Sequence, residues 1–141
     1  MNILVTGGMG FVGSHLVEQL VKEKHKITII TKSLKKRNNL SSIIKKISIE
    51  RCNVTNFLKF GKIIDKVKPD LIIHLAGITS HSESFDKPMK DIDSNAKSTL
   101  FILEKIRKDH PKCKFLLGST FIVIGRPKKL PVNESSECNP T

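Results

Sequence analysis

A cluster of glycines near the start of the chain has the residue types and spacing of a phosphate-binding turn. The segment Thr6-Gly7-Gly8-Met9-Gly10-Phe11-Val12-Gly13 fits G-x-G-x-x-G from Gly8 and G-x-x-G-x-x-G from Gly7. The early glycines permit a tight turn and let backbone N–H groups approach a pyrophosphate, and the last lets a helix pack closely on a sheet. A helix that begins there adds the positive end of its dipole. The segment therefore predicts a dinucleotide site, and an ordinary glycine-rich turn is the weaker alternative.

Two other groups of residues could carry chemistry but form weaker patterns. His81 and Glu83 lie in the segment 79–84 and could act as acid and base, yet nothing nearby in the sequence would orient them, so we favour a solvated loop. Cys52, Cys113 and Cys138 are odd in number, widely spaced and without a metal-ligand pattern. We expect reduced thiols and no metal site.

The elements that must position the glycine turn follow from hydrophobic periodicity. Five short β-prone runs, separated by segments too long for hairpins, lie at 3–5, 26–30, 47–49, 71–75 and 115–117. Helices are predicted at 12–24, at 56–67 and, from apolar residues at 92, 96, 99, 103 and 106, at 92–106, with a weaker candidate at 40–46. Alternating strands and helices predict an α/β fold with a doubly wound parallel sheet.

Length and composition limit the remaining possibilities. A chain of 141 residues with 38% hydrophobic and 27% charged residues is typical of one globular domain. We predict a domain at 1–125 followed by an irregular tail at 126–141. The start of the chain lacks a signal-peptide pattern, and we expect a cytoplasmic protein that binds no membrane.

The chain is strongly basic, and the excess charge is concentrated in one segment. The net charge is +12, and eight Lys or Arg residues but no acid lie between Lys24 and Ile49. Such a segment is ordinarily a solvated face. Without Trp, Tyr or a recognisable reader fold, the sequence disfavours a nucleic-acid partner.

Several ordered motifs together resemble the extended short-chain dehydrogenases, the nucleotide-sugar epimerase/dehydratase family. The glycine turn within 1–33, the segment Pro69-Asp70-Leu71-Ile72-Ile73-His74-Leu75-Ala76-Gly77, the segment Phe115-Leu116-Leu117-Gly118-Ser119-Thr120 and Gly125 are similar to family motifs at family spacing. The resemblance implies a Rossmann fold and an NAD(P) cofactor.

The resemblance also implies roles for individual residues. Thr120 would be the catalytic Ser/Thr whose hydroxyl bonds the reacting sugar oxygen, although a satisfied strand-end hydroxyl is the alternative. Asn53 replaces the usual Asp beside adenine. The implied cofactor-binding residues are Gly7, Gly10, Phe11, Val12, Gly13, Thr31, Lys32, Asn53, Val54, Leu75, Ala76, Gly77, Asn95 and Ser119.

The end of the second predicted strand bears on the choice between NAD and NADP. NAD-selective members carry an acid there that bonds the ribose 2′-OH, whereas this chain has Thr31 followed by Lys32. Without a carboxylate, and with further basic residues nearby, the sequence slightly favours NADP over NAD.

The resemblance implies an epimerase-like enzyme that oxidises a nucleotide-linked sugar and returns the hydride to the other face. Phe121 and Ile122 stand where 4,6-dehydratases carry an Asp-Glu pair, so that subclass is disfavoured. The family's Tyr-x-x-x-Lys would follow Thr141, and we expect this chain to be inactive alone. A non-catalytic NAD(P)-binding or sensor protein is the alternative, and a homodimer is left open.

Overall fold

The computed structural model describes residues 1–140 and contains one parallel sheet with the strand order β3-β2-β1-β4-β5. Its strands are β1 (Asn2–Thr6), β2 (Lys26–Thr31), β3 (Ser48–Arg51), β4 (Leu71–His74) and β5 (Lys114–Leu117). Each predicted strand is confirmed to within two residues at its ends. Successive strands are added on one side of β1 up to β3 and then on its other side, so that β1 pairs with β2 on one side and with β4 on the other. That arrangement is the switch point at which doubly wound sheets bind ligands.

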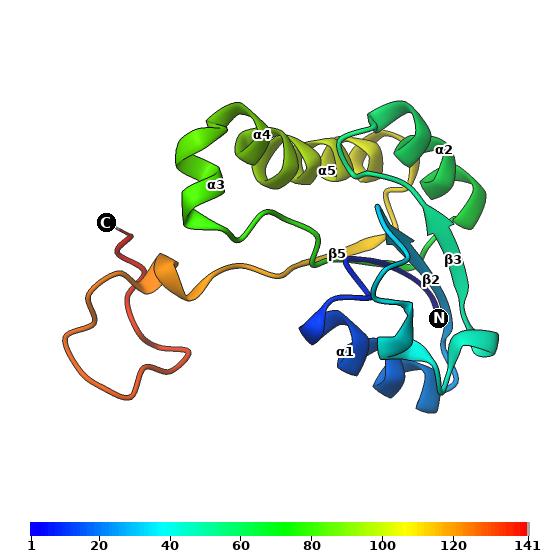
Figure 1. The fold of residues 1–141 in the computed structure, drawn as a ribbon, viewed down its shortest axis with the longest axis horizontal. Helices are drawn as coiled ribbons and strands as arrows, with labels where there is room; N and C mark the ends of the chain where they lie inside the picture. The colour runs from blue at the N-terminus through cyan, green and yellow to red at the C-terminus, as the bar shows by residue number, and fades with distance from the viewer. Residues whose placement is uncertain (141) are drawn as a thin grey trace.

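Helices cover both faces of the sheet, as the predicted fold class requires. Figure 1 shows α1 (Phe11–Lys22) on one face and α2 (Phe57–Val67), α3 (His81–Asp86), α4 (Pro88–Ile92) and α5 (Ser98–Asp109) on the other. Asn56 begins α2, because its side chain accepts a hydrogen bond from the N–H of Lys59. Parallel strands need such crossover helices, so the layers follow from the strand direction.

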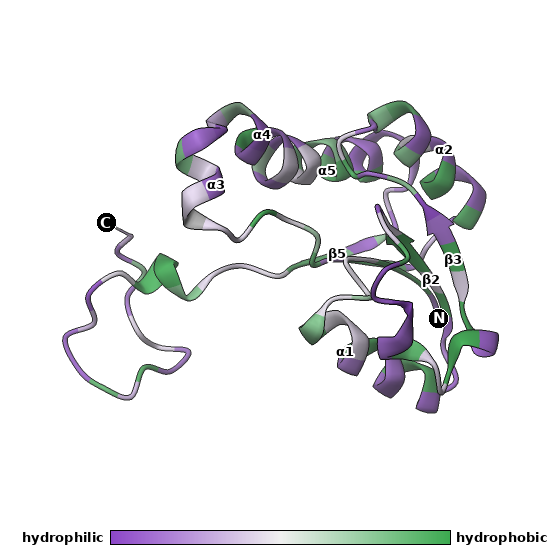
Figure 2. Ribbon diagram, in the orientation of Figure 1, coloured by the Kyte–Doolittle hydropathy of each residue, from purple (hydrophilic) through white to green (hydrophobic). Residues whose placement is uncertain are grey.

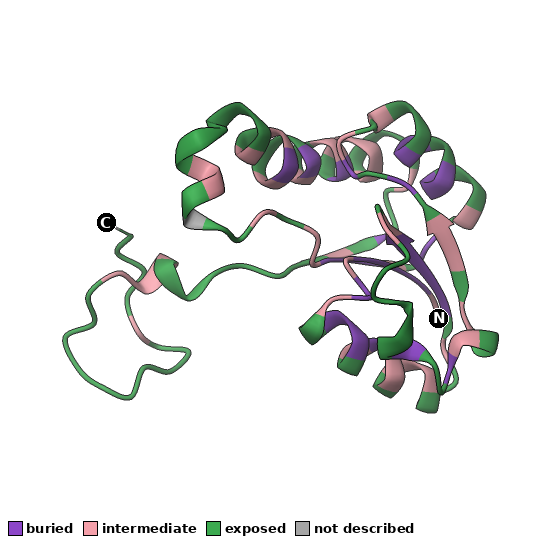
Figure 3. Cartoon of the chain, viewed as in Figure 1, coloured by how far each residue is buried: buried purple, intermediate pink, exposed green. Residues whose placement is uncertain are grey.

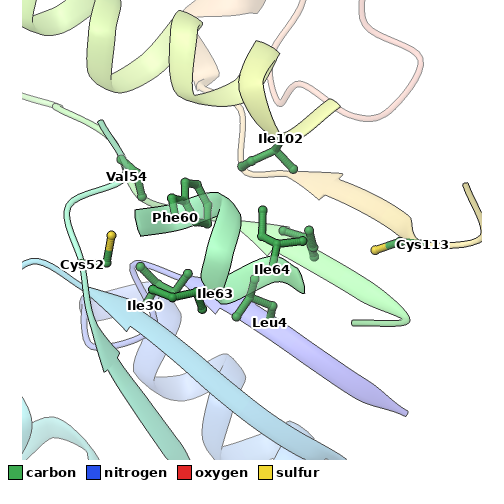
Figure 4. Packing of buried hydrophobic residues seen from close by; sticks show 10 residues of the cluster. Leu4, Ile30, Cys52, Val54, Phe60, Ile63, Ile64, Ile102 and Cys113 are labelled. Atoms are coloured by element: carbon green, nitrogen blue, oxygen red, sulfur yellow. The ribbon is translucent and has the colours of Figure 1, made fainter. Parts of the chain in front are cut away.

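Alternate residues of the strands belong to two hydrophobic clusters, one between the sheet and each layer of helices. Leu4 and Ile30 point towards α2 and α5 (Figure 4), and Ile72 belongs to the same cluster, which includes Phe60, Ile64 and Ile102. Their sequence neighbours Ile3, Val5, Ile29 and Ile73 lie in the second cluster together with Val17 of α1. Burial on both faces explains why the strands appear in the sequence as continuous apolar runs.

Two local predictions are wrong. The segment 40–46 is not an α-helix but holds parts of two 3₁₀ turns, Arg37–Leu40 and Ile44–Lys46, which bury Leu40 and Ile43 beside α1. The segment 79–84 is not a loop throughout, because α3 begins at His81 and its side-chain cap is Ser80, which accepts from the N–H of Glu83. The Ser80-x-x-Glu83 spacing is a capping-box signal that the sequence contained.

The predicted helix at 92–106 is interrupted, and its buried face is different from the predicted one. A π-turn at Asp93–Lys97 separates α4 from α5. Ile92 and Leu103 of the predicted apolar stripe are each 44% exposed, whereas Ser94, Ser98 and Ile102 are buried. The error has a physical cause, since two serines occupy positions that hydrophobic periodicity expects to be apolar.

Residues 126–140 contain neither helix nor strand and extend away from the sheet (Figure 1). Nearly all of this segment is exposed (Figure 3). A short 3₁₀ turn, Phe121–Ile124, lies between β5 and the tail, and its residues form a hydrophobic stretch in Figure 2. Within residues 1–140, no helix is both long and apolar enough to cross a membrane.

Candidate functional site

The glycine turn lies between β1 and α1, and its backbone is folded tightly on itself. Gly7 has φ +70°, and a Cβ atom there would lie 2.9 Å from the backbone of Leu75 and Ala76. The N–H of Gly10 donates to the carbonyl of Gly7 at 2.9 Å. A Cβ on Gly13 would approach the same carbonyl oxygen to 2.4 Å. Of the two glycine registers, Gly7, Gly10 and Gly13 therefore make the turn.

Helix α1 begins with donors that the protein leaves available. Gly10 is the N-cap and contributes no side-chain hydrogen bond, and no acidic residue lies in the first turn. Within residues 1–140, the N–H groups of Phe11, Val12 and Gly13 form no hydrogen bond to the protein. Three free amides at the positive end of a helix have the geometry and charge that suit a phosphate-bearing anion.

A cavity of about 610 Å³ joins this turn to the carboxyl ends of β2, β3 and β4. Most of the predicted cofactor-binding residues line it: Gly7, Gly10, Phe11, Val12, Gly13, Thr31, Lys32, Asn53, Val54, Leu75, Ala76 and Gly77. Asn95, Ser119 and Thr120 are not in its wall. The wall also contains Ile78, Thr79 and Ser94, which the sequence analysis did not select.

Positive charge gathers at the β2 end of the cavity. Lys32, Lys35 and Lys36 line it, and the wall contains no Asp or Glu. The Thr31 side chain bonds to the segment that follows β2, where its hydroxyl donates to the carbonyl of Ser33 at 2.8 Å. The local field therefore favours an anion, while the residue at the usual ribose-binding position is already hydrogen bonded.

The β3 end of the cavity has a small, partly apolar wall. Val54 is buried, and Asn53 is exposed with its side-chain oxygen accepting from the N–H of Thr55 at 3.3 Å. Cys52 is buried beside them, and desolvation raises the pKa of its thiol. An apolar floor with an amide at its rim suits a flat heterocycle.

Asn95 lies behind the β4 end of the cavity and holds the loop that lines it. Its Oδ1 accepts from the N–H of Ile78 at 2.9 Å and its Nδ2 donates to the Ile78 carbonyl at 3.1 Å. Nδ2 also donates to Asp91 Oδ1, which accepts from Ser84. A Cβ on Gly77 would lie 2.6 Å from the Asn95 oxygen. The structure thus gives Asn95 a supporting position and explains why glycine precedes Ile78.

A buried hydrogen-bond relay connects β1, β4 and the π-turn. The N–H of Ala76 donates to Thr6 Oγ1, which lies 2.7 Å from His74 Nδ1. His74 Nε2 lies 3.0 Å from Ser98 Oγ, and Ser98 donates to the carbonyl of Ser94 at 2.6 Å. Because the only hydroxyl hydrogen of Ser98 is used, Nε2 donates to Ser98. Burial favours the neutral imidazole, and in that form Nδ1 accepts from the hydroxyl of Thr6.

This relay predicts a pH dependence of stability. Desolvation lowers the pKa of His74 to about 4, against about 6.5 in the unfolded chain. Between pH 6.5 and pH 4 the unfolded chain binds a proton at His74 and the folded chain does not. The free energy of unfolding therefore keeps its full value above about pH 6.5 and decreases as the pH falls towards 4. We expect urea unfolding to give a free energy about 2 kcal/mol lower at pH 5 than at pH 7. The His74→Gln variant should lose this difference, whereas replacing exposed His15 with Gln should keep it; an equal difference in all three proteins would contradict the prediction.

Ser119 and Thr120 lie beyond the end of β5 and are exposed. The Thr120 hydroxyl oxygen accepts from the N–H of Ile122 at 3.3 Å, which caps the following 3₁₀ turn and leaves its hydrogen free to donate. Glu83 pairs with Lys90, and this contact lowers the pKa of Glu83, while the His81 side chain lies outside the described part of the chain. The structure thus brings together twelve of the fourteen predicted cofactor-binding residues around one cavity, whose wall does not include Asn95 or Ser119. The roles of these residues and of Thr120 remain predictions.

Comparison with known proteins gives consistent matches over almost the whole chain. The family described as GDP-mannose 4,6 dehydratase matches residues 4–141. A UDP-glucose 4-epimerase of Lactobacillus helveticus is 29% identical over 140 residues, which cover 99% of this chain and 42% of that protein. A UDP-glucose 4-epimerase of Klebsiella pneumoniae is 28% identical over 140 residues, which cover 96% of this chain and 100% of that sequence.

A solved structure extends the similarity to the fold. UDP-glucose 4-epimerase from Bifidobacterium longum, in complex with NAD⁺ and UDP, superposes with a TM-score of 0.87 at 27% identity, covering 100% of this chain and 43% of that one. The chain therefore spans less than half of the L. helveticus relative and of this structure. A relative that holds NAD⁺ does not support the slight preference for NADP.

Proposed function

Because this chain belongs to the GDP-mannose 4,6-dehydratase family, we propose that it is the NAD-binding region of an enzyme that epimerises a nucleotide-linked sugar. It corresponds to the N-terminal Rossmann region of UDP-sugar 4-epimerase-like enzymes. The observation that carries the proposal is the cavity, which joins three free amides at the start of α1 to an acid-free, lysine-lined wall. A pyrophosphate at the amides would place one nucleoside over β2 and β3 and the other over β4.

The cavity residues would hold and orient the cofactor. The amides of Phe11, Val12 and Gly13 would bind the pyrophosphate, and Asn53 and Val54 would contact the adenine. Leu75, Ala76 and Gly77 would line the nicotinamide side, where the bound NAD would supply hydride transfer. Thr120 would donate its free hydroxyl hydrogen to the reacting sugar oxygen. The sequence contains no tyrosine, so the proton acceptor used by the family is not among these 141 residues.

We propose NAD as the cofactor, with weak discrimination against NADP. The similar B. longum epimerase, whose structure is a complex with NAD⁺, supports NAD, while the absence of a carboxylate at Thr31 leaves nothing to repel a 2′-phosphate. Calorimetry should therefore show NAD binding and an NAD-to-NADP affinity ratio that changes sharply when a carboxylate is introduced. Failure of the folded chain to bind either dinucleotide would overturn the proposed function.

The Thr31→Asp variant tests the source of this discrimination. We expect it to raise the ratio of NAD to NADP affinity about tenfold, equivalent to about 1.4 kcal/mol, because a carboxylate accepts from the ribose 2′-OH and repels a 2′-phosphate. Ser42→Asp is the matched control, since it makes the same charge change at an exposed residue outside the cavity wall. Equal ratios in the two variants would show that Thr31 does not face the adenosine ribose.

A further inference from the structure

We propose that the edge of the sheet opposite the cavity is a docking surface for an acidic segment of a partner polypeptide. The cavity lies at the carboxyl ends of the strands, so the amino ends of all five strands lie at the other edge. Exposed lysines gather at the starts of four of these strands. We call them the amino-edge lysines: Lys24, Lys26, Lys45, Lys46, Lys68, Lys112 and Lys114.

Backbone hydrogen bonds hold the starts of the strands side by side. The N–H of Lys26 donates to the carbonyl of Met1 at 3.0 Å, and the N–H of Lys114 donates to the carbonyl of Asp70 at 2.9 Å. Since β3 pairs with β2 in parallel, Lys46 enters the sheet at the same edge. With neighbouring strands about 4.8 Å apart, the lysines are spread along roughly 19 Å.

The protein does not neutralise the amino-edge lysines. Within residues 1–140, none of them forms an ion pair, whereas Lys66 beside them is paired with Glu50 at 2.7 Å. Two exposed acids lie at the same edge: Glu23, which lies 3.6 Å from His25, and Asp70, which accepts from a backbone N–H at 2.7 Å. The edge therefore carries a clear excess of positive charge.

Helix dipoles account for only part of this charge. Lys24 and Lys68 lie at the ends of α1 and α2, where a cation is favourable. Lys26 and Lys114 instead begin strands, which have no comparable dipole. The charges of these lysines have no stabilising partner in the described part of the chain, and an anion from outside would supply one.

The chemistry of the edge favours an acidic polypeptide over a nucleic acid or a membrane. The amino-edge lysines include no arginine for bidentate phosphate contacts, and the chain has no Trp or Tyr for base stacking. Binding to a membrane surface normally needs an apolar anchor, whereas the segment that carries Lys45 and Lys46 buries Ile43 in the core. An extended acidic segment rises about 3.3 Å per residue, so about six residues would span the edge.

The inference is independent of the cofactor site. A segment bound at the amino edge leaves the cavity open, because the two lie at opposite edges of the sheet. We therefore expect a partner to bind with the same affinity in the presence and absence of NAD.

Fluorescence anisotropy with a labelled oligoglutamate of about 12 residues, in roughly 50 mM NaCl, tests the inference on the 141-residue chain. The edge variant combines Lys26→Gln, Lys46→Gln and Lys114→Gln, which removes one charge from each of three strand starts. We expect its Kd for the peptide to rise about tenfold, because three of the attractive charges are lost. The wild-type affinity should also fall as salt is added.

The matched control combines Lys62→Gln, Lys87→Gln and Lys129→Gln, which removes the same charge from exposed lysines away from this edge. Its Kd should stay within about twofold of the wild-type value, because distant exposed charges are screened. Equal losses in the two triple variants would overturn the proposal, since net charge alone would then explain binding.

The class of partner is tested with two further probes, a DNA duplex and phosphatidylserine vesicles. Tighter wild-type binding to either probe than to the oligoglutamate, with the same loss in the edge variant, would overturn the choice of an acidic polypeptide. All three proteins should melt at the same temperature, because the substituted lysines are exposed.

Discussion

Replacing Gly10 with valine should abolish dinucleotide binding while the chain remains folded. Gly10 has φ −70° and ψ 179°, an extended conformation that valine adopts readily, and a Cβ there would meet only the Gly7 carbonyl, at 3.1 Å. Yet Gly10 lines the cavity beside the free amides of α1, so an isopropyl group would occupy the space through which a pyrophosphate approaches. We expect the Kd for NAD to rise about 100-fold or more, roughly 2.7 kcal/mol, by titration calorimetry.

The control for this variant is a valine at the opposite end of the sheet. Ser48 is exposed at the first position of β3, so Ser48→Val adds the same branched side chain away from the cavity and should leave the Kd unchanged. Circular dichroism should show both variants folded. A Gly10→Val protein that binds NAD like the wild type would mean that the pyrophosphate does not approach this turn.

Replacing Gly13 with alanine, in contrast, should greatly reduce the free energy of unfolding. The added Cβ would lie 2.4 Å from the Gly7 carbonyl oxygen and 2.8 Å from the Gly8 Cα, and both neighbours are backbone atoms that cannot rotate away. Helix α1 would have to move off the turn, and we expect a loss of about 3 kcal/mol in the free energy of unfolding by urea titration.

The comparison with Gly10→Ala makes this prediction specific. The same substitution at Gly10 meets one atom at 3.1 Å and should cost less than about 1 kcal/mol. Similar urea midpoints for the two alanine variants would show that the close approach of α1 to the turn is not needed for folding. Gly10 and Gly13 would then contribute equally to the stability of the fold.

The sheet and the turn could be predicted because their physical requirements are visible in residue types. Strands buried on both faces need continuous apolar runs, such as Ile27 to Ile30, and the tight turn needs glycine at Gly7 and Gly13. Most residues of the cavity wall could be predicted once the turn was located, because the carboxyl ends of parallel strands lie at the same edge of the sheet.

The prediction of the buried helix face failed at polar residues, because their burial depends on hydrogen bonds to residues that are distant in the sequence. Ser98 is fully buried because His74, from a strand 24 residues away, needs an acceptor for its Nε2–H. Hydrophobic periodicity instead assigned the buried face to Ile92, Ala96 and Leu103. Ser94 carried no signal in the sequence, since its burial depends on the same relay and its exposure to the cavity depends on the π-turn.

The π-turn also places a restriction on chain length. Because it accommodates one more residue than a regular helical turn, deleting a single residue between Asp93 and Lys97 could restore an unbroken α-helix. That deletion would shift the segment before it by about 100° relative to α5, as one residue does in a helix of 3.6 residues per turn. Ser98 would still reach His74, but Asn95 would no longer face Ile78. Insertions and deletions in this segment would therefore be selected against even when they leave every other residue of the site unchanged.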